Sequence, residues 1–344
     1  MSAPARLFPN LGAEEGRGWR RALSLPKVRD IIGWWSALFD RRATIVGVSD
    51  RVASRLPEEL APDADRAAFD FLEGSGALVP WLSTDEAAEF ARAEGFELAC
   101  APAQVVRSVH DKAFAQRVAE REGLVPADLA GAIEIIEPEL LRGGEAALRR
   151  LGAVAGRGFV LKPRLGSSGR GRVRVDGHEV EGALERLAAR GGCLLEPWLS
   201  RTEDLSAQMW VDPGGEIRLL GTLRQEVTPS GVWSAHAGVV DPRGSIRSGS
   251  RYDEALRDAA YRVARAAREA GFFGVCGLDA FAYRQPGGDE ALRPVVEFNA
   301  RFTVGTIATG LVQRALRCGT IRHSAEFRFS GARGLETDPG TVGR

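Results

Sequence analysis

Residues 294–301 read Pro-Val-Val-Glu-Phe-Asn-Ala-Arg, and their alternation of apolar and polar residues is typical of a β-strand. Side chains in an extended strand point alternately to its two faces. Val296 and Phe298 would therefore share a face that is suited to a protein core. Three polar side chains would share the other face: Glu297, Asn299 and Arg301. The stretch thus predicts a strand that presents a carboxylate, an amide and a guanidinium in one row.

A second apolar run, at residues 274–283, precedes this strand, and Gln285-Pro-Gly-Gly-Asp289 separates the two with a strong turn pattern. Reflection of the hairpin about Gly288 places Asp279 opposite Glu297. Like charges tolerate such closeness when a cation lies between them. Oxygen ligands with few protein donors suit Mg²⁺ that a phosphate also holds. The hairpin therefore predicts a magnesium site, and the alternative is a solvated strand face with ordinary polar side chains.

The composition is that of a soluble globular protein with room for two domains, or for one large domain with a lid, in 344 residues. Lys and Arg together number 46, as do Asp and Glu, and this zero net charge argues against a protein that coats nucleic acid. The sequence has no apolar run of 18 residues and no signal-peptide pattern, so we expect no membrane partner and a cytoplasmic location. The four Cys and four His are scattered, which indicates neither a disulfide framework nor a zinc site.

The first 105 residues alternate strand-like and helix-like segments. Strands are expected at 43–48, 77–81 and 96–99, and helices at 26–39 and 85–94. This alternation predicts an α/β unit with a mostly parallel sheet. A glycine-rich phosphate loop follows none of these strands, so the pattern does not indicate a dinucleotide site.

Residues 166–171 read Gly-Ser-Ser-Gly-Arg-Gly and connect two strand-like segments, 159–162 and 172–175. Such a loop can bring its backbone N–H groups against a phosphate, and Lys162 would add a positive charge. The loop joins strand to strand and lacks the Gly-Lys-Ser/Thr sequence, so it is not a Walker A loop. An ordinary surface hairpin is the alternative interpretation.

Later segments extend this mixed α/β pattern. Helices are expected at 111–122, 146–154, 180–189 and 253–270, and strands at 193–199, 205–211 and 216–223. Lys112 lies in the first turn of its helix, where a surface charge is the ordinary interpretation.

Six segments, in this order, resemble the ATP-grasp ligases over about residues 105–320. They are Asp111-Lys112, Val160-Leu-Lys-Pro-Arg164 with its Gly/Ser hairpin, Leu195-Glu-Pro-Trp-Leu199, Asp204-Leu-Ser206, Gly277-Leu-Asp279 and Val296-Glu-Phe-Asn-Ala-Arg301. The resemblance implies a Rossmann-like pre-ATP-grasp unit over 1–105 and an ATP-grasp domain with antiparallel sheets over 106–330. It also implies a lid subdomain at about 126–195. We expect residues 331–344 to be a disordered tail.

The resemblance also implies roles for individual residues. Lys112 and Lys162 would contact ATP phosphates, Asp204 would hold the ribose, and Arg301 would face the transferred phosphate. A flexible lid over the phosphates would comprise Gly166, Ser167, Ser168, Gly169 and Gly171. The connector that reads adenine would comprise Glu196, Trp198 and Leu199, and the ligands of Mg²⁺ or Mn²⁺ would be Asp279, Glu297 and Asn299.

The sequence departs from the family at two places. The ribose position is commonly Glu, so the choice between Glu203 and Asp204 stays open. Asn299 is followed by Ala-Arg rather than by the Pro-Gly turn of the D-alanine ligase branch, and the chain has no biotin-carrier segment.

These features resemble those of an ATP-dependent carboxylate–amine ligase that acts on small molecules such as amino acids or peptides. A carboxylate is a poor electrophile, and its phosphorylation gives an acyl phosphate that an amine can attack. Phosphoryl transfer needs mainly positioning and charge neutralisation, which Mg²⁺, Lys and Arg provide.

Some questions stay open at this point. Arg224 could pair bidentately with a substrate carboxylate, or it could form a structural ion pair. The role of His236 is open, and Cys276 fits packing better than nucleophilic attack. A non-catalytic ATP-binding module and an ATP-grasp kinase are the alternative functions, and a homodimer is an option.

Overall fold

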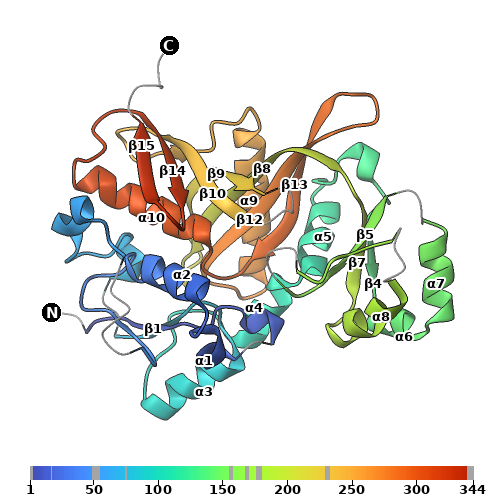
Figure 1. Cartoon of the computed structure of the whole chain (residues 1–344), viewed down its shortest axis with the longest axis horizontal. Helices are drawn as coiled ribbons and strands as arrows, with labels where there is room; N and C mark the ends of the chain where they lie inside the picture. Colours follow the sequence, from blue (N-terminus) through green and yellow to red (C-terminus); the bar gives the residue numbers. More distant parts are fainter. Residues whose placement is uncertain are drawn as a thin grey trace.

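The computed structural model describes residues 3–16, 18–48, 55–73, 76–154, 158–166, 170–175, 180–228 and 233–338. These residues form three β-sheets, of three, eight and four strands. The largest sheet lies at the centre, with the N-terminal unit on one side and the smaller four-stranded unit on the other (Figure 1).

The N-terminal unit contains a parallel sheet of order β2-β1-β3. Its strands are β1 (Arg6–Phe8), β2 (Thr44–Ile45) and β3 (Leu78–Pro80). Its helical segments are η1 (Ala13–Glu15), α1 (Trp19–Ala22), α2 (Pro26–Ser36), η2 (Glu58–Asp63), η3 (Asp70–Leu72) and α3 (Asp85–Glu94). The predicted parallel α/β unit is confirmed, although its strands are shorter than expected. The strand expected at 96–99 is reduced to one parallel bridge between Leu78 and Leu98.

Two further helices lead to the site, α4 (Ala103–His110) and α5 (Lys112–Arg121). Asp111 separates them, and its carboxylate accepts a hydrogen bond from the N–H group of Ala113. This N-cap satisfies a backbone donor that a helix leaves open at its start. It fixes Lys112 as the first residue of α5.

The central sheet has the order β13-β12-β8-β9-β10-β14-β15, with β11 paired to β10. Its strands are β8 (Ser200–Val211), β9 (Ile217–Val227), β10 (Trp233–Val240), β11 (Ile246–Arg247), β12 (Gly274–Arg284), β13 (Glu290–Asn299), β14 (Ala325–Ser330) and β15 (Gly334–Asp338). All of its pairs are antiparallel.

Two long helices, α9 (Asp253–Glu269) and α10 (Val304–Arg317), cover opposite faces of this sheet. A Cβ atom at Gly221 would lie 3.2 Å from Thr309 of α10. The next residue, Thr222, donates instead to Asp253 of α9. Because successive strand residues point to opposite faces, the two helices lie on either side of β9.

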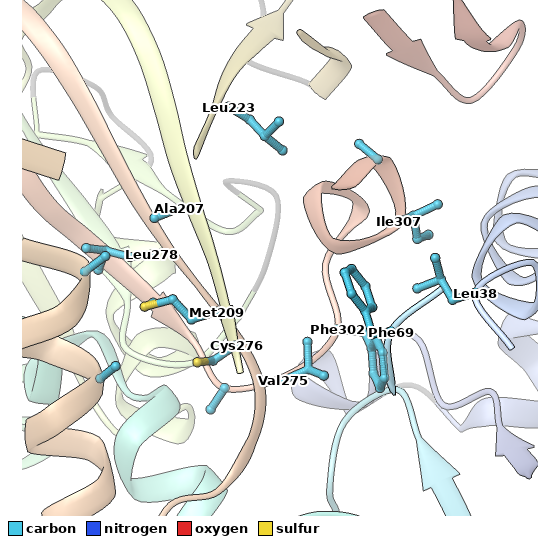
Figure 2. Close-up of a cluster of buried hydrophobic side chains, with 14 of the residues drawn as sticks. Leu38, Phe69, Ala207, Met209, Leu223, Val275, Cys276, Leu278, Phe302 and Ile307 are labelled. Carbon is cyan, nitrogen blue, oxygen red and sulfur yellow. The ribbon is translucent and has the colours of Figure 1, made fainter. Parts of the chain in front are cut away.

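The main hydrophobic core joins the N-terminal unit to the central sheet. Figure 2 shows Leu38 and Phe69 of the N-terminal unit in the same cluster as Ile307 of α10 and Met209 of β8. Trp35, which is fully buried, packs edge-on against Phe302. A shared core of this kind holds the two units in one arrangement.

The four-stranded unit has a core of its own. It consists of η4 (Ala127–Leu129), β4 (Glu134–Ile136), α6 (Pro138–Arg142), α7 (Glu145–Gly152), β5 (Phe159–Pro163), β6 (Val173–Arg174), α8 (Val180–Ala189) and β7 (Cys193–Pro197), with the strand order β4-β7-β5-β6. These elements occupy the segment that the sequence predicts as a lid, residues 126–195, and extend two residues past it. We call them the lid subdomain, and its movement stays a prediction.

The C-terminal segment differs from the expectation of a tail that is disordered from residue 331. Gly334–Asp338 forms β15, and Leu335 packs against the core. The strand covers the edge of β14 with mostly polar residues, so its sequence looks like that of a loop. Residues 339–344 lie outside the described part. Within the described ranges, every helix is too short or too polar to cross a bilayer.

Candidate active site

Asp279 of β12 lies directly opposite Glu297 of β13, which confirms the pairing predicted from the sequence. The reflection about Gly288 that led to it fails near the turn, where Arg284 pairs with Glu290. The ladder shifts its register between Asp279 and Phe281, and this shift restores the expected pairing at the two carboxylates. An irregularity of this kind re-aims side chains next to functional sites.

Each of the two carboxylates has a different partner. Asp279 accepts hydrogen bonds from the side-chain amides of Gln225, at 2.8 Å, and Asn299, at 3.0 Å. Glu297 Oε1 lies 2.9 Å from Lys112 Nζ. Sequence reasoning missed Gln225, because it lies on β9, more than fifty residues from the carboxylate that it contacts.

The electrostatics of this pair suit a bound cation. Burial, and then the charge of Glu297, raise the pKa of Asp279 to about 6. Burial acts in the same direction on Glu297, but the charge and the hydrogen bond of Lys112 act against it, and the pKa of Glu297 is lowered. The described residues contain no group of three or more His, Cys, Asp or Glu side chains that could hold a metal ion. The donors in the hairpin are two carboxylates and the amide of Asn299. This set fits a hard divalent cation that a phosphate completes.

Lys112 connects the hairpin to the lid subdomain. Its Nζ atom also donates to the carbonyl oxygen of Gly166, at 2.9 Å. Gly166 has a φ angle of +141°, in a region that residues with a Cβ atom rarely adopt. The interpretation of Lys112 as a surface charge is wrong, because the side chain is buried.

A second cluster of charges lies where β5 meets β7. Lys162 and Arg293 both form ion pairs with the buried carboxylate of Glu196. Burial would raise the pKa of Glu196, but Arg293 and Lys162 together lower it to about 2. Burial lowers the pKa of Lys162 to about 8, against the attraction of Glu196. Two cations that share one carboxylate leave positive charge that an anionic phosphate would complement.

The structure separates Glu203 from Asp204, between which the sequence left the ribose role open. Asp204 pairs with Arg201 at 2.7 Å and lines the cleft described below. Glu203 instead accepts a hydrogen bond from Ser250 and lines a separate depression. Neighbouring residues on a strand point to opposite faces, so only Asp204 is placed to contact a ligand in the cleft.

These side chains meet in one open cleft between the lid subdomain and the central sheet, with about 900 Å³ of space. The predicted site residues that line it are Lys112, Lys162, Gly166, Asp204, Asp279 and Glu297. An adjoining pocket has the connector as its wall, including Glu196, Trp198 and Leu199. Lys162 and Asp204 line both spaces, so the two are continuous.

Trp198 is the most conspicuous residue of the connector. The residue is 44% exposed, although large aromatic residues are ordinarily buried for the most part. The guanidinium groups of Arg172 and Arg174 lie over this ring, at 5.4 and 5.2 Å from its centre. The pocket therefore has an aromatic wall at the end that is away from the carboxylates.

Four predicted residues of the described part are absent from the lining of both spaces: Arg224, Arg301, Asn299 and Gly171. Asn299 nevertheless contacts Asp279 through its side-chain amide. Arg301 follows the end of β13, so strand alternation no longer sets its direction, and it pairs with Glu14 at 3.2 Å. Arg224 lies opposite Leu205, which is fully buried in the main core, whereas the next residue, Gln225, points into the cleft. Strand alternation directs the side chain of Arg224 to the other face of β9, and its contact with a substrate stays a prediction.

The remaining residues of interest lie apart from the cleft or outside the described part. His236 is buried, and burial lowers its pKa to about 4. Cys276 is fully buried in the main core, and burial raises the pKa of its thiol, which confirms packing. Ser167, Ser168 and Gly169 lie outside the described residues. Gly171 has a φ angle of +74°, which favours glycine at this position.

Comparisons with known proteins support this architecture at the level of the fold. No family model matches the chain, and no curated protein matches it in sequence. A biotin carboxylase from Campylobacter jejuni, in a β,γ-ATP complex, is 17% identical with a TM-score of 0.52, over 94% of this chain and 74% of that one.

Two further solved structures are similar. The biotin carboxylase domain of the 2-oxoglutarate carboxylase of Hydrogenobacter thermophilus, with MgADP and bicarbonate, is 16% identical with a TM-score of 0.55, over 95% of this chain and 74% of that one. An N5-carboxyaminoimidazole synthase from Aspergillus clavatus, with ADP and an aminoimidazole ribonucleotide, is 14% identical with a TM-score of 0.50, over 95% and 81%. The chain therefore has the ATP-grasp fold, as its motifs predicted.

Proposed function

We propose that the protein is an ATP-dependent ligase that phosphorylates a carboxylate and couples the resulting acyl phosphate to an amine. The observation that carries this proposal is the cleft, where two lysines, one ribose-binding candidate and two paired carboxylates face the same space. A fold alone does not define a function, but a site of this composition suits phosphoryl transfer.

The proposal gives each part of the cleft a role toward ATP. Lys162 would contact the phosphates through the positive charge that Glu196 leaves uncompensated. Asp204 would accept hydrogen bonds from the ribose hydroxyls, and the connector at Trp198 would face the adenine. The solved structures with ATP or ADP support a nucleotide here, because their fold is shared.

Asp279, Glu297 and Asn299 would hold Mg²⁺, or Mn²⁺ in its place. The metal would supply positive charge against the phosphate oxygens and align them for transfer. Lys112, which is 2.9 Å from Glu297, would contribute a second positive charge beside the same oxygens.

The chemistry proposed has two steps. A carboxylate oxygen of the acid attacks the γ-phosphorus, the bond from that phosphorus to the bridging oxygen breaks, and ADP leaves. The amine nitrogen then attacks the acyl carbon, loses a proton, and displaces inorganic phosphate. The side chains of the cleft accelerate these steps by positioning and charge, which is the main contribution that proteins make to phosphoryl transfer.

A second candidate keeps the same first step with bicarbonate as the acid. The Hydrogenobacter structure, which has the same fold, is a complex with both MgADP and bicarbonate, and this supports testing bicarbonate here. A kinase that phosphorylates a hydroxyl group and a module that binds ATP without turnover are two further candidate functions, and a homodimer stays a prediction.

Trapping of the acyl phosphate tests the proposal. The protein is incubated with ATP, Mg²⁺, hydroxylamine and a panel of carboxylic acids, and hydroxamate and ADP are measured together. A ligase gives equal amounts of hydroxamate and ADP with the correct acid. A kinase gives ADP and a stable phosphate ester, a carboxylating enzyme gives ADP release that depends on bicarbonate, and a binding module gives neither. AMP and pyrophosphate as products would contradict the proposal.

A further inference from the structure

A second cavity lies at the N-terminal sheet. It has about 480 Å³ of space. Ala13 and Glu14, which follow β1, line it together with residues 82–84, which follow β3. The chain passes from β1 to β2 on one side and later to β3 on the other, so the cavity lies at a topological switch point. Crevices of this kind, at the carboxyl ends of parallel strands, are the ordinary place for a ligand in an open α/β sheet.

His110 at the end of α4 gives this cavity an unused hydrogen-bond donor. Its Nδ1 atom accepts a hydrogen bond from the N–H group of Ala300, at 3.3 Å. An imidazole that accepts at Nδ1 carries its proton at Nε2 when neutral, and burial lowers the pKa of His110 to about 4. The Nε2 atom has no hydrogen-bond partner among the described residues, although the side chain is only 3% exposed. A buried donor without a partner is costly, so a ligand that offers an acceptor would bind favourably.

Glu14 adds a hydrogen-bond acceptor to the wall of this cavity. Its side chain is 3% exposed and pairs with Arg301 at 3.2 Å. Arg301 compensates the charge of Glu14, and Arg107, which also lines the cavity, pairs with Asp85. A carboxylate beside a neutral His110 can still accept hydrogen bonds from an ammonium group on the ligand. A small molecule that carries both an acceptor oxygen and a cationic group would therefore complement the walls of this cavity.

The cavity is close to the proposed chemistry. Leu165 lines it, whereas the next residue, Gly166, lines the main cleft and accepts a hydrogen bond from Lys112. The charges of Glu297 and Lys112 both act on His110. A ligand in the cavity would thus lie close to the carboxylate hairpin.

We propose that this cavity binds one of the two coupling partners as a molecule of amino-acid size. This molecule offers a carboxyl or carbonyl oxygen to His110 Nε2–H and an ammonium group to the Glu14 carboxylate. The assignment as a coupling partner rests on the proposed ligase function, whereas the binding itself does not.

Binding is tested first without turnover. Saturation-transfer NMR is recorded on the full chain with Mg²⁺ and a non-hydrolysable ATP analogue, with the twenty L-amino acids as probes. At least one amino acid is expected to bind, and its decarboxylated amine and its deaminated acid are each expected to bind at least about tenfold more weakly. The absence of any binding amino acid, or equal binding of both truncated forms, would overturn the proposal.

Two substitutions then separate ligand binding from structural support. In His110→Asn, the side-chain oxygen can still accept from Ala300, but the donor at the Nε2 position is lost. In His110→Gln, the amide nitrogen can reach the Nε2 position, but the acceptor for Ala300 is lost. We expect His110→Asn to raise the Kd of the amino acid about tenfold and His110→Gln to leave it within about threefold. The reverse order, or equal losses, would assign His110 a structural role and overturn the proposal.

The controls keep this inference distinct from the ligase function. Binding of the ATP analogue is expected to be unchanged in both variants, because His110 is not among the described residues that line the main cleft. Amino-acid binding without any ADP release would support the site and contradict the ligase. ADP release from acids and amines that do not compete with the bound amino acid would overturn its assignment as a coupling partner and leave the ligase intact.

Discussion

Lys112 Nζ lies 2.9 Å from Glu297 Oε1, and the same atom donates to the carbonyl oxygen of Gly166 at an equal distance. One buried ammonium group thus joins helix α5, the carboxylate hairpin and the segment that follows strand β5 of the lid subdomain. Without a cation, Lys112 is the main partner that keeps Glu297 ionised. We expect a bound metal and phosphate to compete for both of these groups, so that ligand binding and the position of the lid are linked.

Glu297→Gln is expected to lower turnover on the order of a hundredfold or more while leaving the fold intact. Glutamine has nearly the same shape but lacks the negative charge that would bind the metal. Asn299→Ala is expected to act in the same direction, because it removes an amide from the same site. ADP release is measured over a range of Mg²⁺ concentrations, and thermal unfolding reports on the fold.

Glu290→Gln is the matched control for this experiment. It makes the same change at the other end of β13, where Glu290 pairs with the exposed side chain of Arg251. Activity is expected to stay at the wild-type level. Normal turnover of both Glu297→Gln and Asn299→Ala at low Mg²⁺ would refute the metal assignment.

Asp204→Asn is expected to raise the KM for ATP about tenfold, because a charged acceptor for the ribose hydroxyls is lost. The adjacent Glu203→Gln is expected to leave KM within about twofold, since Glu203 bonds Ser250 away from the cleft. Steady-state kinetics with ATP as the varied substrate compares the two variants. Equal effects of both substitutions, or a larger effect at Glu203, would show that Asp204 does not hold the ribose.

The parts of the site that follow from local sequence could be predicted. Helix α3, for example, is bounded by Thr84, whose side chain accepts from Ala87, and by Gly95 in the left-handed region, and its predicted limits are those observed. The alternation along residues 294–299 and the turn at 285–289 similarly predicted the pairing of Asp279 with Glu297. Each of these rests on interactions within a few residues or on a single hairpin.

The parts that depend on three-dimensional packing could not be predicted. Gln225 reaches Asp279 because β9 and β12 flank β8, and nothing near it in the sequence reveals this order. The cleft-facing side chain at this place is that of Gln225 rather than Arg224, and a one-residue difference in strand register decides between them. The partner of Arg301 is Glu14, which is 287 positions away along the chain and belongs to another unit.

Nucleotide binding is expected to weaken as the pH rises above about 8. Burial lowers the pKa of Lys162 to about that value, so its ammonium group loses its proton there. Phosphate would favour the charged form, so binding of a non-hydrolysable ATP analogue at pH 9 should take up protons and be up to about tenfold weaker than at pH 7. Calorimetry in two buffers of different ionisation enthalpy measures both quantities.

The lowered pKa of Lys162 also makes the stability of the folded protein depend on pH. Between pH 8 and the ordinary value of 10.5, the unfolded chain keeps the proton on Lys162 while the folded chain has lost it. The contribution of this group to the stability of the nucleotide-free protein therefore rises with pH in that window.

Lys162→Arg is the control for the binding experiment. A guanidinium stays charged at pH 9, so this variant should bind the ATP analogue without taking up protons. Proton uptake that persists in this variant would show that another group is responsible.

Glu14 and Arg301 form the last pair with a testable consequence, since they join the N-terminal unit to the end of β13. Glu14 is 3% and Arg301 11% exposed, so the ion pair is almost entirely removed from water. Loss of one member of such a pair leaves the other charge buried without compensation, which ordinarily destabilises a protein by about 3–5 kcal/mol.

Arg301→Met is accordingly expected to lower the free energy of unfolding by about 3 kcal/mol, measured by urea denaturation at pH 7. The double variant Glu14→Gln/Arg301→Met should recover part of this loss, because neither buried charge remains. Arg66 and Glu73 provide a control pair that is 64% and 48% exposed, and Glu73→Gln should leave the denaturation midpoint nearly unchanged. If the double variant is instead less stable than Arg301→Met by the full effect of Glu14→Gln alone, the two residues act independently. The contact between them would then not be what couples the N-terminal unit to the carboxylate hairpin.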